Sequence, residues 1–243
     1  NFVLHIIFIL TVVGCLFPIL LLLAVSFTDN GALLANGYSL FPAKWSLEAY
    51  RYIFLDSSKI FRAYGVTIFN TVVGALLSVS VIVLYAYPLS RPDFKLKKVA
   101  FTFIMAILVM PTQVTAMGFL RLITNMGMYD SLLPLIIPSI ASPSVFYFMY
   151  SYLQSSLPMS LIEAARIDGS GEFRTFNTIV LPITKPAIAV QAIFTFVGSW
   201  NNYFVPALVI QSKDKMTVPI LIATLRGADY MNFDMGKIYT MIM

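Results

Sequence analysis

Few side chains in this sequence could carry out chemistry, and their spacing matches no catalytic or metal-binding motif. His5 is the only histidine and Cys15 the only cysteine among 243 residues, so neither a two-histidine metal motif nor an internal disulfide can form. No G-x-x-x-x-G-K-[ST] motif is present to hold nucleotide phosphates. Gly169-Ser-Gly171 resembles part of a phosphate loop, but a predicted helix precedes it where a strand is required. We therefore expect no catalytic residue, metal ligand or bound cofactor in this chain.

The most distinctive polar feature is an insert at 153–185 between two apolar segments. It contains Glu163-Ala-Ala-Arg-Ile-Asp-Gly169 and closes with Ile179-Val-Leu-Pro182. Pro158 can begin a helix because it has no amide proton to lose, and Gly169 suits the left-handed position that ends one. We expect Ser170 to cap a second short helix, with Glu172 in its first turn, which Pro182 and Pro186 end. The insert is thus predicted to be a helix-turn-helix.

Two interpretations of this helix-turn-helix are open. Leu161, Ala164, Ala165 and Asp168 are spaced i, i+3, i+4 and i+7 and share one helix face, where the small alanines would admit a partner surface. Alternatively, Ser160 and Glu163 form a capping-box pattern, which would give Glu163 a purely local role. Apolar side chains that a solvated loop would not leave uncovered favour docking, namely Leu161, Ile162, Ile167, Phe173 and Phe176.

The composition is that of a membrane protein. Apolar residues make up 59% of the chain, charged residues 11%, and the mean hydropathy is +0.84. About 20 apolar helical residues cross the hydrocarbon core of a bilayer. We predict an all-α bundle of about six transmembrane helices, in one transmembrane domain over 1–243, with spans at 3–27, 63–87, 99–122, 132–152, 186–210 and the start of a sixth at 236.

The proline content predicts where these helices deform. Pro111 falls inside the third span, and Pro134, Pro138 and Pro143 should kink the fourth. Asn1 is not an initiator methionine and Met243 lies inside an apolar run, so both ends look clipped.

The connecting loops predict the orientation. The loop at 88–98 and the insert at 153–185 must share a side, and the compact basic loop places both in the cytoplasm. The segments at 28–62 and 211–233 are then external loops, with Ser46 a fair N-cap for an amphipathic helix in the first. The net charge of +5 is scattered over loops, which indicates lipid headgroups as partners and excludes nucleic acid.

The predicted spans contain no carboxylate that could couple transport to an ion. All Asp and Glu residues fall outside the hydrocarbon cores, and Arg121 lies near a span end, where it can snorkel to the interface. Ion-driven carriers usually keep an acidic residue in the membrane. We therefore expect the energy for uphill transport to come from another chain.

The insert resembles a known family signature. Glu-Ala-Ala, then Asp-Gly, a spaced Phe and Ile-x-Leu-Pro are similar to the loop of permease subunits of binding-protein-dependent ABC importers, with Ser170 where alanine is more usual. The long first external loop and Gly198-Ser-Trp-Asn-Asn-Tyr-Phe204 look like the second permease of maltose-type carbohydrate importers. Gly37-Tyr-Ser-Leu-Phe-Pro42 looks closest to the branch for complex or acidic oligosaccharides.

This resemblance implies a multi-pass subunit of the bacterial inner membrane. Its partners would be a second permease, two cytoplasmic ATPases that bind ATP and Mg²⁺, and an external solute-binding protein. The insert would form coupling helices seated on an ATPase, and the loop at 211–233 would reach the binding protein through Lys213, Asp214 and Lys215. The coupling residues implied are Glu163, Ala164, Ala165, Asp168, Gly169, Phe176, Leu181 and Pro182.

Polar and aromatic side chains within the spans are candidates for a sugar pathway. Sugars need hydrogen-bonding groups and aromatic faces, and an unpartnered amide in lipid is costly. Bonds that merely hold helices together are an equally good explanation for each position. The candidates are Thr112, Gln113, Thr115, Trp200, Asn201, Asn202 and Tyr203.

The sequence leaves three functions open. The first is the permease of an ABC importer, for an oligosaccharide or for a non-sugar solute. The second is a self-sufficient carrier or channel that ATP does not drive. The third is a membrane scaffold that recruits a soluble protein without transporting anything.

Overall fold

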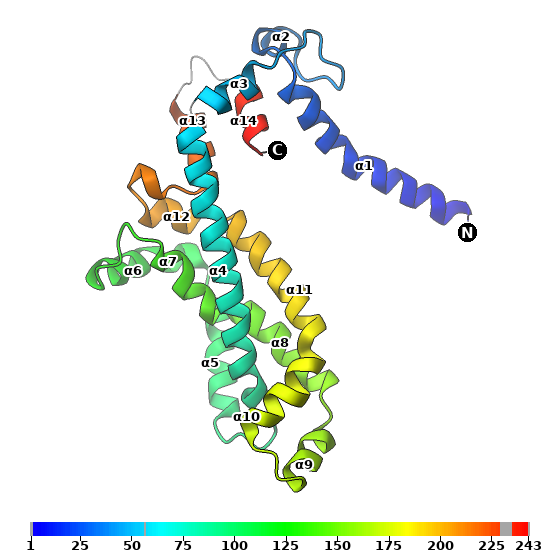
Figure 1. Cartoon of the computed structure of the whole chain (residues 1–243), viewed down its shortest axis with the longest axis vertical. Coiled ribbons are helices and arrows are strands. Elements are labelled where there is room, and N and C mark those ends of the chain that lie inside the picture. The colour runs from blue at the N-terminus through cyan, green and yellow to red at the C-terminus, as the bar shows by residue number, and fades with distance from the viewer. Residues whose placement is uncertain (1, 56, 229–234, 243) are drawn as a thin grey trace. The chain divides into compact units, whose positions relative to one another are not determined.

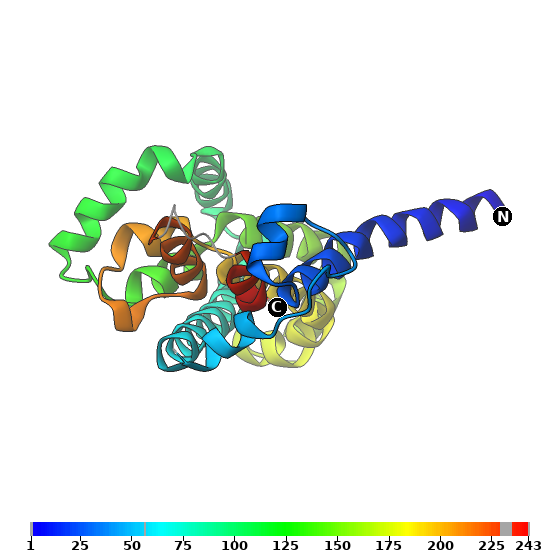
Figure 2. The same ribbon diagram turned by 90° about the horizontal axis from the view of Figure 1, so that it is seen from above.

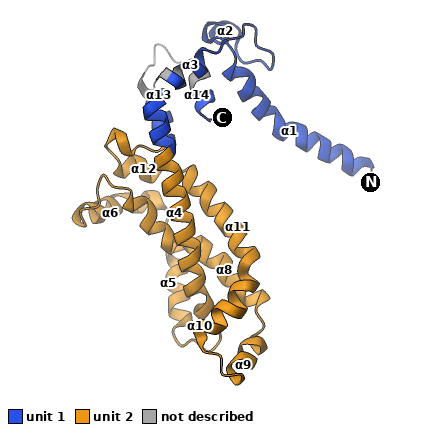
Figure 3. Ribbon diagram, in the orientation of Figure 1, with its two compact units in different colours: residues 1–64, 218–243 blue, residues 65–217 orange. Residues whose placement is uncertain are grey.

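The computed structural model describes residues 2–55, 57–228 and 235–242, and their regular secondary structure is helical apart from one isolated bridge between Thr28 and Trp45. The predicted all-α class is therefore confirmed (Figure 1). The chain divides into two compact units, residues 1–64 with 218–243 and residues 65–217 (Figure 3). The single transmembrane domain expected over 1–243 stays a prediction.

The first unit begins with α1 (Phe2–Ser26), an apolar helix of 25 residues close to the predicted first span. A short helix that the sequence did not predict, α2 (Asn30–Asn36), follows because Asp29 Oδ1 accepts a bond from Ala32 N at 3.2 Å and caps it. Helix α3 (Glu48–Leu55) begins where expected, with Ser46 Oγ accepting from Glu48 N at 3.1 Å.

Two further helices complete this unit, α13 (Val218–Ala228) and α14 (Met235–Ile242). Helix α13 lies within the external loop predicted at 211–233, so that segment is more ordered than its polar composition indicated. The part of the loop at 229–233 lies outside the described residues. The predicted start of the sixth span at 236 falls within α14.

The second unit starts within α4 (Ser57–Ser90), which is longer than the predicted span at 63–87. Helices α5 (Lys97–Val109) and α6 (Thr112–Asn125) follow, bent by 105° where one span at 99–122 was expected. Pro111 causes the break, because the residue before a proline avoids helical angles and Met110 has an extended ψ of 120°. Seen from above, α5 is end-on while α6 runs lengthwise (Figure 2).

The predicted kinks of the fourth span are confirmed. The chain from 133 to 156 is divided into α7 (Leu133–Ile136), a 3₁₀ turn (Ile137–Ala141) and α8 (Pro143–Ser156). Each of the three pieces holds one of the expected prolines at one of its first two positions, where a missing N–H costs nothing. Ser78 Oγ donates to Ser139 O at 2.6 Å and joins α4 to this irregular stretch.

The predicted end of the insert at Pro182 and Pro186 is wrong. After α9 (Met159–Ile167), helix α10 (Glu172–Thr175) continues through a π-helical turn (Phe176–Val180) into α11 (Leu181–Trp200) without leaving helical geometry. In the π turn, Leu181 N donates to Phe176 O, and Pro182 is the second residue of α11. The helix therefore runs from Glu172 to Trp200, whereas the sequence predicted 186–210.

Past Trp200 the chain turns into α12 (Phe204–Val209) and a 3₁₀ turn (Lys213–Lys215). The core of the second unit lies between α4 and α8, where Ile82, Phe146 and Met149 are fully buried. Among the described residues, four helical stretches are long and apolar enough to cross a bilayer, or up to five if the bent pair α5–α6 is one span: Phe2–Ser26, Ser57–Ser90, Leu133–Ser156 and Glu172–Trp200.

Candidate functional site

One face of α9 packs against the rest of the second unit, and the opposite face is exposed. Its Ile162 is 1% exposed and belongs to the core, and Ala165 is also buried. Glu163, Ala164 and Asp168 lie on the exposed side. The four residues predicted to share a partner-facing surface are thus divided, because Ala165 packs inward and only Leu161, Ala164 and Asp168 remain exposed.

The turn after α9 has the predicted left-handed glycine. Gly169 has φ +77°, its N–H donates to Arg166 O at 3.0 Å, and Ser170 N donates to Ala165 O at 2.8 Å. This pair of bonds is the Schellman arrangement that ends helices at a glycine. A side chain at position 169 would be strained in this conformation by about 1–2 kcal/mol.

Three local predictions for the insert are wrong. Pro158 occupies the N-cap of α9, which lacks a side-chain cap, so Ser160 and Glu163 form no capping box. Ser170 does not cap α10, because Gly171 takes that position and the hydroxyl of Ser170 accepts a bond from Thr175 Oγ1 at 3.0 Å. Ile162 and Phe176 are buried in the core, which leaves Leu161, Ile167 and Phe173 as the exposed apolar residues.

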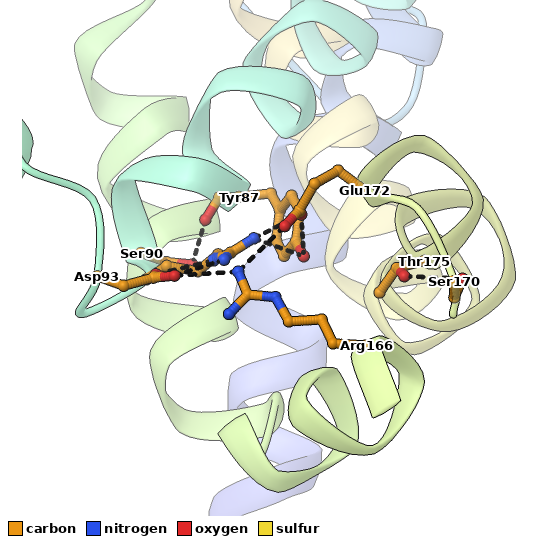
Figure 4. Close-up of polar contacts among 8 residues, drawn as sticks. Tyr87, Ser90, Asp93, Arg166, Ser170, Glu172 and Thr175 are labelled. Carbon is orange, nitrogen blue, oxygen red and sulfur yellow. Dashed lines mark hydrogen bonds and ion pairs between the residues drawn. The ribbon is translucent and has the colours of Figure 1, made fainter. Parts of the chain in front are cut away.

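A cluster of four charged side chains anchors this end of the unit (Figure 4). Arg91, just past α4, donates to Asp93 Oδ2 at 2.6 Å and to Glu172 Oε2 at 2.5 Å. Arg166 of α9 donates to the same two carboxylates at 3.0 Å each. Tyr87 of α4 adds a hydroxyl bond to Glu172 Oε2 at 3.4 Å. We call Arg91, Asp93, Arg166 and Glu172 the ionic cluster.

The ionic cluster favours the charged forms of Arg91 and Asp93. Hydrogen bonds from Arg91 hold the pKa of Asp93 below its usual value. The pKa of Arg91 is in turn raised, first by its bond to Asp93 and then by the nearby Tyr87 and Glu172, although partial burial works against this. Arg91 therefore remains cationic, and both arginines bridge the loop at 91–96 to the start of α10.

Sequence reasoning missed the ionic cluster as a unit. Arg91 and Asp93 were seen only as part of a basic loop, and Glu172 only as a first-turn residue that suits a helix dipole. Among the described residues, the contacts from Arg166 span 73 positions to Asp93 and 6 to Glu172, so spacing along the chain carried no signal for them. The close spacing of Arg91 and Asp93 was the one local hint.

The remaining predicted residues of the insert lie at the start of the long helix. Phe176 packs its ring against that of Tyr87, with centroids 5.8 Å apart. Leu181 and Pro182 are the first two residues of α11. Together, α9 and the Gly169 turn sit beside α10 at one end of the second unit, the lower end in Figure 1.

A cavity of about 680 Å³ lies in the second unit, between α6, the irregular stretch around α7, and α11 with α12. It is a size that holds small organic ligands. Its lining has hydroxyls, amides and phenyl rings but no ionisable side chain. Its polar lining consists of Thr112, Thr115, Ser139, Ser142, Ser144, Gln191, Thr195, Ser199 and Asn202.

The structure separates the residues predicted to face a sugar. Thr112, Thr115 and Asn202 line the cavity, whereas Gln113, Trp200, Asn201 and Tyr203 are not among its lining residues. The amide of Asn201 donates to Val197 O at 2.9 Å in its own helix, which satisfies it locally. Trp200 stacks on Phe196 at 5.9 Å.

Gln191 is the cavity residue that the sequence reading passed over. It is 6% exposed in α11 and lines the cavity. One turn further along the same helix, Thr195 Oγ1 is buried and has no hydrogen-bond partner among the described residues. An unpartnered amide in an apolar span is costly, and this argument singled out Asn201 in the sequence. The same argument could have singled out Gln191.

The three residues predicted to reach an external partner form the 3₁₀ turn Lys213–Lys215. Lys213 and Asp214 are exposed. Lys215 instead pairs with Asp130 Oδ2 at 3.3 Å. No group of His, Cys, Asp and Glu within the described segments could hold a metal ion.

Comparison with known proteins gives one matching family model. It is described as a binding-protein-dependent transport system inner membrane component and matches residues 78–242. The arabinooligosaccharides transport system permease protein AraQ of Halalkalibacterium halodurans is 31% identical over 93% of this chain and 82% of its own length. The trehalose/maltose transport system permease protein MalG of Thermococcus litoralis is 32% identical over 90% of this chain and 79% of its own length.

A solved structure supports the fold. The crystal structure of a bacterial ABC transporter involved in the import of the acidic polysaccharide alginate contains a chain similar to this one, with a TM-score of 0.85. The match covers 99% of this chain and 89% of that chain at 21% sequence identity.

Proposed function

Because this chain belongs to the family of binding-protein-dependent transport system inner membrane components, we propose that it is a permease subunit of an ABC importer for a sugar or oligosaccharide. The family and the membrane-capable helices make it a multi-pass inner-membrane protein. The names of the relatives support a carbohydrate as the solute, since they include arabinooligosaccharide, trehalose/maltose and diacetylchitobiose systems.

The single observation that supports ATP coupling through this chain is the exposed face of α9 beside its left-handed turn. Glu163, Ala164 and Asp168 are available to a partner, and Ile167 is 86% exposed next to them. Apolar side chains so exposed need a covering surface. A cytoplasmic ATPase is the partner we assign, and it would supply the ATP and Mg²⁺ chemistry that this chain lacks.

The long helix gives the coupling a physical route. Arg166 links α9 to Glu172, which begins the helix that continues through α11 to Trp200. Gln191 and Thr195, about 28 Å and about 35 Å further along that helix by its rise per residue, line the cavity. A displacement of α9 by a closing ATPase would thus move the cavity lining as well, because a continuous helix transmits movement along its axis.

The cavity supports a neutral polar solute pathway. Amides and hydroxyls can exchange hydrogen bonds with sugar hydroxyls, and the rings of Phe148 and Phe194 can pack against sugar C–H faces. A second permease subunit would supply the other wall of the path, and a solute-binding protein would deliver the sugar from outside. A carrier independent of ATP has no observation that favours it.

The test uses the assembled importer in lipid vesicles, with ATP hydrolysis measured with and without its binding protein. We expect Gly169→Pro to abolish stimulation, because proline requires φ near −65° and cannot donate the bond to Arg166 O. Glu163→Lys should also abolish stimulation, through the exposed face of α9, with insertion unchanged. Gly171→Ala is the matched control, since Gly171 has φ −71° and space for a Cβ atom.

Normal stimulation in both Gly169→Pro and Glu163→Lys would count against the coupling role. Vesicles that contain this chain alone and show solute flux without ATP would instead favour the carrier or channel. An assembly with all partners that binds the ATPase but transports nothing would favour the scaffold.

A further inference from the structure

One carboxylate at the other end of the second unit organises two loops. Asp130 follows α6, and its backbone N–H donates to Val209 O at 3.0 Å, the last residue of α12. Its Oδ1 accepts bonds from Gln211 N at 2.8 Å and Ser212 N at 2.9 Å. Its Oδ2 accepts the hydroxyl of Ser212 and pairs with Lys215 Nζ at 3.3 Å.

This arrangement is unusual for so short a connection. Asp130 is the one non-glycine residue with positive φ in the described chain, at 54°, a conformation that few L-residues adopt and that local side-chain hydrogen bonds make accessible to Asp. Lys215 also donates to Asp130 O at 2.5 Å, so the two residues meet through backbone and side chain. We call Asp130, Ser212 and Lys215 with their bonds the aspartate clamp.

The clamp determines which charges remain available. Lys215 is committed to Asp130, so its ammonium group serves to hold the turn. Lys213 and Asp214 are exposed and make no bond or ion pair with the described part of the chain. A fixed turn therefore presents one cation and one anion side by side.

We propose that Asp130 is a positioning residue that holds the turn at 211–215 in the shape that engages the solute-binding protein. This inference rests on the proposed function, which supplies that partner. A flexible loop with the same charges would lose conformational entropy on each encounter, because its backbone and long side chains would have to be ordered. Because the clamp orders the turn before the partner arrives, less entropy is lost on binding. The two exposed charges at the tip of the turn would then orient the partner.

The experiment titrates the assembled importer with the solute-binding protein, isolated from cells with its solute bound, and follows ATP hydrolysis. Asp130→Ala should raise the half-saturating concentration of binding protein about tenfold and leave basal hydrolysis unchanged. Asp130→Gly should do the same, since glycine keeps the positive φ without strain and loses only the side-chain bonds.

Asp130→Asn should raise the half-saturating concentration only two- to threefold. The amide oxygen can still accept from Gln211 N and Ser212 N, whereas the ion pair with Lys215 is lost. Ser131→Ala is the control, because the hydroxyl of Ser131 bonds only within its own loop, to Met128 O at 2.7 Å. Lys215→Met is the second probe of the clamp should Asp130→Ala fail to assemble, with a two- to threefold increase expected.

The outcomes distinguish the two levels of inference. If the unaltered importer is not stimulated by the binding protein, the proposed function fails. If it is stimulated and the Asp130→Gly and Lys215→Met variants match it at every concentration, the positioning role is overturned. If the maximal rate falls while the half-saturating concentration stays constant, the clamp serves a later step and the inference is again wrong.

Discussion

The two ends of the second unit both use charged side chains to hold a connection in place, but they distribute the bonds differently. In the ionic cluster, Asp93 and Glu172 each accept bonds from both Arg91 and Arg166. In the aspartate clamp, a single carboxylate receives every side-chain contact. The cluster is therefore a network with alternative bonds, whereas the clamp depends on one residue.

This difference matches the backbone at each end. The cluster joins the loop at 91–96 to α9 and α10, whose own backbone ladders already fix these two helices, so its charges need only hold the helix ends against the loop. The clamp organises short connections, in which the N–H groups of Gln211 and Ser212 have no helix to satisfy them and bond to a side chain instead. A network suits the movement proposed for α9, and a single anchor suits the fixed shape proposed for the turn at 211–215.

The strongest test of this comparison is at Arg91, the member of the cluster least exposed to solvent. Arg91→Met removes bonds to both carboxylates and to Tyr87, which should weaken the attachment of the loop at 91–96 to α10 by about 1–2 kcal/mol. Amide hydrogen exchange of this loop and of the first turn of α10 in the assembled importer should accelerate about tenfold. The turn at 211–215 should keep its exchange rates.

Arg166→Met is the matched change within the same cluster. Its side chain is 42% exposed and Arg91 still bridges both carboxylates, so the loss should be about 0.5 kcal/mol and exchange about twofold faster. Equal effects of the two changes would show that the cluster is not the redundant network described above.

The cavity of the second unit is lined by neutral polar groups instead of charged ones. Substitutions there test whether solute uptake depends on these groups. Gln191→Leu should lower the rate of solute uptake into vesicles about threefold, because one hydrogen bond to the solute is worth about 0.5–1.5 kcal/mol. Asn201→Leu should leave uptake unchanged, since that amide bonds to Val197 O. If Asn201→Leu lowered uptake more than Gln191→Leu, the solute path would lie on the other side of α11.

The smallest effect expected is that of pH. Bonds from Ser212 and Gln211 hold the pKa of Asp130 well below its usual range, and Arg91 lowers that of Asp93. A carboxylate whose pKa is lowered by folding stabilises the folded state at pH values above its unfolded pKa of about 3.9. This stabilisation is lost only as the pH falls through the pKa of the folded state. Between about pH 5 and pH 8, neither Asp130 nor Asp93 should titrate. The exchange protection of the segments at 91–96 and 211–215, corrected for intrinsic rates, should therefore be constant.

A loss of protection at 211–215 near pH 6 would mean that Asp130 is not held by these bonds in solution. On further acidification, protection at the ionic cluster should be lost before protection at 211–215, because the pKa of Asp130 is held further below its usual value than the pKa of Asp93. The opposite order would contradict this expectation.

The sequence was sufficient for features that depend on neighbours along the chain. The apolar runs predicted membrane helices, and Pro134, Pro138 and Pro143 predicted the broken fourth one. Gly169 predicted its own left-handed turn, since few residues other than glycine adopt that conformation cheaply. The candidate helix-turn-helix was located for the same reason.

The sequence was misleading where a local rule had a competitor. Pro182 and Pro186 usually end helices, but the π turn absorbed the change in register and the helix continued from Glu172 to Trp200. The failed capping box at Ser160 has a similar cause, because Pro158 began the helix two residues earlier than that motif requires.

By itself, the sequence determined that this is a membrane protein with a structured polar insert, because composition and helix-ending residues act locally. Only the tertiary structure decided that Arg91 meets Glu172, that Asp130 holds Ser212, and that Gln191 faces a cavity while Asn201 does not. These pairings join positions far apart in the chain. They depend on which helix faces pack together, and periodicity along one helix does not specify its neighbour.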